Sequence, residues 1–186
     1  MANDNVRLVV FSALLTALTD IMGKDGKNSV LRFAGLSEYL DKDVPPSTED
    51  EIPYEKLGSL LKSMNELLGH GTNAILFESG RKFAVYLSPF GYSLAEVIKK
   101  LERWLGGKWT IEDMGKDIEK VTIEDCPVCR GLENADTAFC TIISGTLSRI
   151  KEESTGESYD VEEIQCSAMG HKNCEYIVKK AEDDNN

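Results

Sequence analysis

Apolar residues recur at helical spacing along the first part of the chain. The segment from Val6 to Met22 is predicted to form a helix, with Asp4 as its N-cap and Gly23 just beyond its end. Apolar side chains cover most sides of this helix rather than one stripe. Such a helix lies either in the centre of a core or between two subunits.

The same spacing predicts three more helices, at 29–40, 54–68 and 94–105. The acidic, proline-containing segment 41–53 between the first two is predicted to be an exposed loop. Ser93 is positioned to cap the last helix, and Gly106 and Gly107 end it.

Residues 73–87 allow two interpretations. Two short apolar runs flank a polar centre, which fits a β-hairpin that turns at Ser79 and Gly80. The segment also fits a single helix in which Gly80 lies at a close packing contact, at a cost of about 1 kcal/mol relative to alanine.

The pattern changes to alternation after Gly107. Strands are predicted at 109–114 and 120–125 around a turn at Gly115, followed by a helix from Asp136 or Thr137 to about Ile150. Two further strands are predicted at 159–166 and 175–180. The polar, acidic residues 181–186 are expected to be disordered.

Composition narrows the possible functions. The 186 residues carry a formal charge of −11, which argues against binding to nucleic acid or to anionic membranes. The longest apolar run, Leu8 to Leu18, is well short of the roughly 20 residues that a membrane span needs. The chain also opens without the basic residues of a secretion signal, so we expect a soluble, cytoplasmic protein.

Five cysteines, an odd number, lie in the last third of the chain. A single cysteine is more often a small buried apolar residue, but five together favour metal binding or thiol chemistry. Thiolates bind zinc in a tetrahedral arrangement, and a carboxylate oxygen can take one position. The candidate ligands are Cys126, Cys129, Cys140, Glu163, Cys166, His171 and Cys174.

The arrangement of these residues resembles the signature of the 4-vinyl reductase domain family, over roughly residues 126–180. This family includes archaeal proteins called hydrocarbon-binding and the aromatic-sensing modules of bacterial transcription activators. The N-terminal half resembles archaeal members more loosely. The resemblance rests on Cys140 with Gly145 and Leu147, followed by Glu163-x-x-Cys166-Ser167-Ala168-x-Gly170-x-x-x-Cys174-Glu175-Tyr176.

The resemblance implies a metal site made by four residues, because Cys140, Glu163, Cys166 and Cys174 match the positions that hold zinc in the aromatic sensors. Along an ideal strand, Glu163 and Cys166 point to opposite faces, so a shared metal requires a bulge or a strand end between them.

Cys126 and Cys129 are two thiols beyond this set. They could be an alternative half of the metal site, a redox pair, or a site for another cofactor.

The resemblance also implies a fold. We expect one α+β domain over residues 1–180, with 1–53 as an N-terminal helical extension and loop and 54–180 as the core. Helices pack against a small antiparallel sheet in such domains, as in the ligand-binding domains of nitric-oxide signalling and Golgi transport proteins. An apolar pocket lies among their helices, and this fold favours a helix over a hairpin at 73–87.

Aromatic residues concentrate between positions 77 and 109. Any one of them is more readily explained as core, but the cluster is typical of a pocket with a few polar groups. The predicted ligand-binding residues are Phe77, Phe83, Tyr86, Phe90, Tyr92, Trp104 and Trp109, and His70 could add a polar group. His171 is interpreted as a solvated turn residue.

The chain contains neither a nucleotide-binding loop nor a nucleophile motif. A zinc ion with four protein ligands is structural rather than catalytic. We therefore expect a non-enzymatic domain that binds or senses a small apolar or aromatic molecule, such as a hydrocarbon. It would be a homodimer with the 6–22 helix in or near the interface. The alternatives are an enzyme or accessory factor in tetrapyrrole vinyl reduction, and an interaction module resembling vesicle-tethering subunits.

Overall fold

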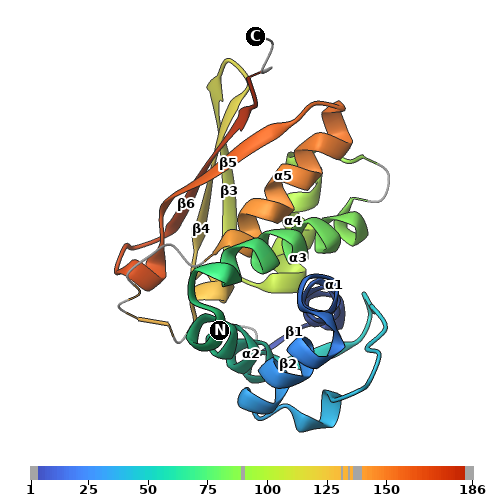
Figure 1. Cartoon of the computed structure of the whole chain (residues 1–186). Coiled ribbons are helices and arrows are strands. Elements are labelled where there is room, and N and C mark those ends of the chain that lie inside the picture. The colour runs from blue at the N-terminus through green and yellow to red at the C-terminus, as the bar shows by residue number, and fades with distance from the viewer. Residues whose placement is uncertain (1–3, 89–90, 131, 134, 136–139, 183–186) are drawn as a thin grey trace.

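A four-stranded antiparallel sheet forms one side of the molecule, and helices lie against it (Figure 1). The computed structural model describes residues 4–88, 91–130, 132–133, 135 and 140–182. The strand order is β3-β4-β6-β5. The strands are β3 (Lys108–Gly115), β4 (Ile118–Glu124), β5 (Tyr159–Gln165) and β6 (Cys174–Lys180). Helices combined with an antiparallel sheet confirm the predicted α+β class.

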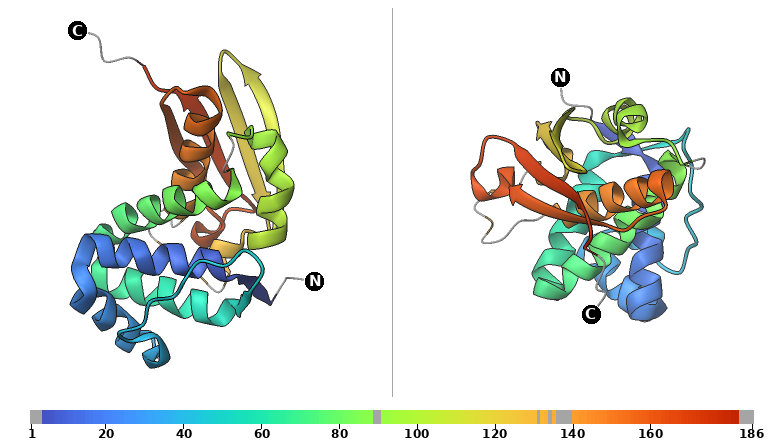
Figure 2. Two further views of the ribbon diagram at one scale, coloured as in Figure 1. Left: turned by 90° about the vertical axis from the view of Figure 1, so that its right-hand side faces the viewer. Right: turned by 90° about the horizontal axis from the view of Figure 1, so that it is seen from above.

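The helices form a layered stack beside this sheet (Figure 2). They are α1 (Leu8–Phe33), α2 (Tyr54–Leu68), α3 (Thr72–Leu87), α4 (Leu94–Leu105) and α5 (Thr141–Thr155). Helix α5 packs on the sheet beside β5, α3 crosses α5, and α1 packs on the other side of α3. Within the described ranges, no helix combines the length and apolarity that a membrane crossing requires.

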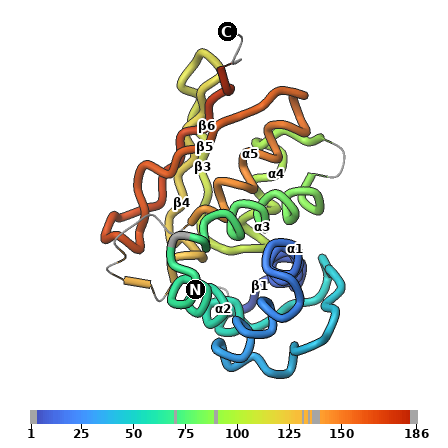
Figure 3. The backbone as a smooth tube through the Cα atoms, in the orientation of Figure 1, coloured from blue at the N-terminus to red at the C-terminus, as the bar shows by residue number. Residues whose placement is uncertain are grey.

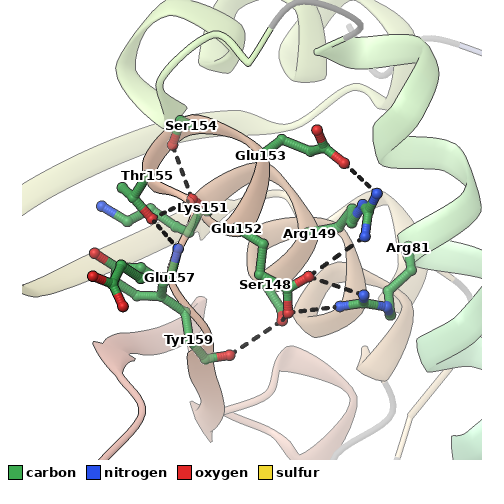
Figure 4. Close-up of polar contacts among 10 residues, drawn as sticks. All are labelled: Arg81, Ser148, Arg149, Lys151, Glu152, Glu153, Ser154, Thr155, Glu157 and Tyr159. Carbon is green, nitrogen blue, oxygen red and sulfur yellow. Dashed lines mark hydrogen bonds and ion pairs between the residues drawn. The ribbon is translucent and has the colours of Figure 1, made fainter.

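Residues 73–87 form a helix, so the interpretation as a single helix is confirmed. Gly80 of α3 and Gly145 of α5 lie where the two helices touch. The same crossing carries an ion pair in which the guanidinium of Arg81 donates to both carboxylate oxygens of Glu152, at 3.0 and 2.9 Å (Figure 4). Arg149 also pairs with Glu152, at 3.6 Å, and with Glu153.

The N-terminus differs from the prediction in one respect. Asp4 does not cap the helix, because Asn5–Arg7 forms strand β1, which pairs with β2 (Glu51–Pro53) inside the predicted loop. The Asp4 carbonyl accepts a hydrogen bond from the backbone of Tyr54, at 2.8 Å. This non-local pairing competes with helical capping and starts the helix at Leu8.

Gly23 interrupts the first helix, as predicted, with φ 72° and ψ 176°. The next helix, however, resumes directly and ends at Phe33, so the predicted range of 29–40 is wrong. Gly35 explains the difference, because it takes the left-handed conformation with φ 71° and lets the backbone N–H of Leu36 donate back to the carbonyl of Leu31 at 2.9 Å. That contact folds the chain back, and only a short 3₁₀ turn, η1 (Ser37–Tyr39), follows.

Helix α1 is buried inside the single chain. Between Leu8 and Met22, eight apolar residues are at most 4% exposed: Val9, Val10, Phe11, Ala13, Leu14, Leu15, Ala17 and Leu18. Its apolar character therefore does not require a second subunit, and the homodimer stays a prediction.

The other predicted boundaries hold closely. The hydroxyl of Ser93 donates to Glu96 at 2.6 Å and its backbone N–H at 2.8 Å, which lowers the pKa of that carboxyl and caps α4. Helix α5 starts at Thr141, whereas the predicted start at Asp136 or Thr137 lies outside the described residues. Most of the predicted disordered tail also lies outside them.

A buried cysteine cluster as candidate metal centre

Four separate segments bring the five cysteines together. Cys126 precedes the 3₁₀ turn η3 (Pro127–Cys129) and Cys129 ends it, just after strand β4. Cys140 directly precedes helix α5, Cys166 directly follows β5, and Cys174 begins β6. The segment after β4 and the turn between β5 and β6 lie side by side (Figure 3). The backbone N–H of Ala135 donates to the carbonyl of Ala168 between them, at 2.9 Å.

The sulfur atoms of the five free cysteines pack against one another. Cys129 Sγ lies 3.0 Å from Cys140 Sγ, 3.5 Å from Cys166 Sγ and 3.4 Å from Cys174 Sγ. Cys140 Sγ lies 3.7 Å from Cys126 Sγ and 3.9 Å from Cys174 Sγ. Cys140, Cys166 and Cys174 are fully buried, and Cys126 and Cys129 are 5% and 6% exposed.

These distances suit a tetrahedral metal ion. Four sulfurs at about 2.3 Å from zinc lie about 3.8 Å from one another. Two groups of possible ligands have all their ligand atoms within 4.8 Å of each other. They are Cys126, Cys129, Cys140 and Cys174, and the predicted set Cys140, Glu163, Cys166 and Cys174. The two groups share Cys140 and Cys174, so the buried cluster is consistent with a metal-binding site.

The bulge that the predicted set requires is present. The register of β5 against β6 shifts between Glu163 and Gln165, with Glu163 opposite Tyr176 and Gln165 opposite Glu175. Ile164 is 43% exposed, whereas Cys166 is fully buried. The shift therefore brings the carboxylate and the thiol to the same side of the strand.

Glu163 is held by two donors. Its Oε2 accepts the backbone N–H of Cys140 at 3.1 Å, and its Oε1 accepts the hydroxyl of the fully buried Tyr176 at 3.4 Å. Burial, with Cys166 next to it, raises the pKa of Glu163 to about 9. Without a cation this carboxyl is therefore protonated at neutral pH.

The surroundings shift the pKa values of two of the thiols in opposite directions. Burial raises the pKa of Cys140 well above its ordinary value. Hydrogen bonds from Cys126 first, and then from the other three thiols, lower the pKa of Cys174. The backbone N–H of Ser167 also points at Cys174 Sγ, at 3.3 Å. A divalent cation would compensate the charge of thiolates in this buried cluster.

A small apolar cavity of about 10 Å³ lies beside the cluster, between the helices and η3. Its walls are Val6, Val10, Leu57, Leu61, Phe83, Leu105, Pro127, Val128, Ile142, Ile143 and Thr146. Sequence reasoning missed most of these residues. Only Pro127 and Val128 could have been singled out from the sequence, because they are two apolar residues between two predicted metal ligands.

The predicted aromatic residues are not gathered into one pocket. Phe83 lines the cavity and faces Trp104, with 6.1 Å between ring centroids. Trp109 is buried, and its indole N–H donates to the carbonyl of Gly106 at 2.9 Å. Tyr86 and Tyr92 are 39% and 43% exposed.

Four other residues that the sequence analysis considered lie apart from the cavity or outside the described residues. Phe77 is half-buried at the α3–α5 crossing. Phe90 and the side chain of His70 lie outside the described residues. His171 is exposed in the turn before β6 and belongs to neither ligand group.

Comparison with known proteins matches the family model of the 4-vinyl reductase domain to residues 120–180, which confirms the resemblance over that stretch. The uncharacterized protein MJ0150 of Methanocaldococcus jannaschii is 22% identical over 159 residues, covering 77% of this chain and 90% of that protein.

Solved structures share the fold at low sequence identity. The phenol-responsive sensory domain of the transcription activator PoxR, solved with phenol, is 15% identical at a TM-score of 0.55, over 69% of this chain and 75% of that one. An H-NOX protein from S. oneidensis is 10% identical at a TM-score of 0.63, over 95% and 100%. A trafficking protein particle complex subunit 3 from Naegleria fowleri is 16% identical at a TM-score of 0.56, over 69% and 93%.

Proposed function

We propose that this protein is a non-enzymatic binding or sensing domain for a small apolar or aromatic molecule, braced by one zinc ion. The observation that carries the proposal is an apolar cavity walled by the cysteine segment, in a fold shared with a phenol-responsive sensory domain. The cavity walls offer almost no polar groups, so a charged ligand would lose its hydration without gaining a partner.

Zinc is the metal that the donor set favours. Thiolate sulfur with at most one carboxylate is typical of structural zinc sites, whereas magnesium and calcium prefer oxygen ligands. We propose Cys140, Glu163, Cys166 and Cys174 as one ligand set, with Cys126 and Cys129 as additional ligands. Zinc bound there would join the start of α5 to the end of β5 and the start of β6, in addition to the hydrogen bonds that already connect these elements.

The cavity must expand to hold an aromatic ring. Its volume of about 10 Å³ has room for about one water molecule. The side chains of α2 and η3 would therefore move apart when a ligand enters. Phe83 would contact the ligand first among the predicted aromatics, and the other six remain proposed contacts at greater distance.

Native mass spectrometry and thermal unfolding of the full chain test this function together. We expect about one zinc per chain, and we expect phenol and toluene to raise the melting temperature. Benzoate is the matched control because it carries the same ring with a charge, and it should have no effect. Failure of every apolar compound to stabilise the protein would instead favour the interaction-module alternative.

A further inference from the structure

The segment Cys126-Pro127-Val128-Cys129 has two faces with different neighbours. Its sulfurs belong to the cysteine cluster, since Cys126 Sγ lies 3.7 Å and Cys129 Sγ 3.0 Å from Cys140 Sγ. Its two middle side chains, Pro127 and Val128, form part of the cavity wall. One short turn therefore separates the candidate metal from the cavity.

The same turn is attached to helix α2 on the cavity side. The hydroxyl of Tyr54 donates to the carbonyl of Arg130 at 3.1 Å, and the Arg130 guanidinium lies 4.5 Å from the Tyr54 ring centroid. Leu57 and Leu61, on the same helix, are cavity walls. A displacement of the turn would therefore move residues of the cavity wall directly.

The outer side of the turn faces solvent. A surface cleft of about 370 Å³ is lined by Asp125, Cys126, Cys129, Arg130, Ser167 and Lys172. A movement of the turn into this cleft would carry Cys126 and Cys129 away from Cys140. An inward movement would close the cavity.

A metal ion can be held with or without this turn. Cys126 and Cys129 belong to one of the two ligand groups, and Glu163 and Cys166 complete the other. Both groups contain Cys140 and Cys174. Exchange of Cys126 and Cys129 for Glu163 and Cys166 would release the turn while keeping the ion in place.

We propose that a metal ion ligated by Cys126 and Cys129 fastens the wall of the apolar cavity, so that metal ligation and ligand entry are coupled. This inference rests on the proposed function and adds its regulation. The metal-fastened turn gives the closed cavity, and an apolar ligand that pushes Pro127 and Val128 outward weakens ligation by this pair. Coupling of this kind is reciprocal, so each ligand changes the affinity of the other by the same factor.

Hydrogen exchange of the full chain, with zinc bound and after chelation, tests the coupling without any apolar ligand. Zinc removal should speed amide exchange at least tenfold in residues 126–132 and in the first half of α2, with little change in α1. The variant C126S/C129S should exchange fast in residues 126–132 whether zinc is bound or not. The matched control E163Q/C166S keeps the other ligand group and should retain zinc-dependent protection.

A second measurement uses zinc and toluene as probes. Saturating toluene should lower the zinc affinity of the wild-type chain at least fivefold, and C126S/C129S should lose this effect. Unchanged exchange in residues 126–132 upon zinc removal would overturn the inference, as would a uniform rise that includes α1. Absence of toluene and phenol binding, with zinc-dependent protection retained, would overturn the proposed function but leave the metal-fastened turn in place.

Discussion

Gly80 on α3 and Gly145 on α5 meet at one crossing where neither position has room for a Cβ atom. A Cβ at Gly80 would lie 2.0 Å from the carbonyl oxygen of Ile142, and a Cβ at Gly145 would lie 2.0 Å from that of Phe77. Each glycine thus lets the backbone of the other helix approach. The crossing joins the helices that surround the cavity to the helix that carries Cys140 at its start.

Replacing Gly145 by alanine should lower the free energy of unfolding by at least about 2 kcal/mol, because the helices must separate to admit the methyl group. Denaturant unfolding monitored by circular dichroism measures the change. Gly58→Ala is the matched control, since its Cβ would lie 3.4 Å from the Tyr54 ring, an ordinary contact. That control should be neutral or stabilising by up to about 1 kcal/mol. Equal effects of the two substitutions would refute the steric explanation.

The Arg81–Glu152 ion pair should stabilise the same crossing. Both side chains are about a quarter exposed, at 24% and 25%, so solvent screens part of the interaction. We expect Arg81→Met and Glu152→Gln to couple by about 1 kcal/mol in a double-mutant cycle. A coupling energy below the error of the measurement would show that the ion pair does not stabilise the crossing.

Substitution of the shared ligands distinguishes the two metal-ligand groups. Cys174→Ser removes a sulfur from both groups and should lower zinc content and melting temperature together, since metal binding is coupled to folding. Cys166→Ser should lower both as well, to a smaller extent, and Cys126→Ser should retain most of the zinc. Elemental analysis of the purified variants gives the comparison. A zinc-free wild-type chain of unchanged stability would exclude the metal site.

The location of the ligand can be tested with two aromatic positions. Phe83 lines the cavity, whereas Trp109 is also buried but hydrogen-bonded to the end of α4. A ligand in the cavity predicts that Phe83→Leu weakens phenol binding at least tenfold and that Trp109→Leu has a smaller effect. Calorimetric titration with phenol measures both affinities, and zinc content should stay constant. A larger effect of Trp109→Leu would indicate that the ligand binds near the other predicted aromatic residues and not in the cavity.

Light scattering at micromolar concentration tests the predicted homodimer. Exposed apolar side chains remain on α1 and α3, with Ile21 and Val85 each 47% exposed. If these form the interface, Val85→Glu should convert a dimer to a monomer without changing the unfolding transition of the chain. A monomeric wild-type protein would contradict the predicted homodimer.

Local signals were sufficient for much of the fold. Gly23, Ser93 and Gly106 marked helix boundaries correctly because their effects are confined to neighbouring residues. Local signals could not decide between a helix and a hairpin at 73–87. The role of Gly80 is to allow close contact with α5, which lies far along the chain. Pairing of Asn5–Arg7 with Glu51–Pro53 was missed for the same reason. No short-range pattern reports a partner so distant in the sequence.

The candidate metal site was more predictable than the cavity. Cysteines are recognised by type, and the spacing of Glu163 and Cys166 even required the bulge that is present. The cavity is formed by ordinary apolar residues from several helices, a strand and a turn, and such residues look the same whether they fill a core or line a space. Only the three-dimensional placement of Pro127 and Val128, relative to one another and to α2, shows that they line a cavity and do not fill a core.

The register shift at Ile164 also constrains anyone who would transplant or redesign this centre. A regular strand of the same sequence, without the bulge, would turn Cys166 away from the face that carries Glu163, because a one-residue slip reverses the direction of every following side chain. Copying the ligand residues onto a regular hairpin would therefore give the right sequence and an incomplete site. A transfer of the site to another protein would have to include strand β5, its bulge and the following turn together. Deleting Ile164 would leave Glu163 and Cys166 two positions apart, which is the spacing that places both side chains on one face of a regular strand.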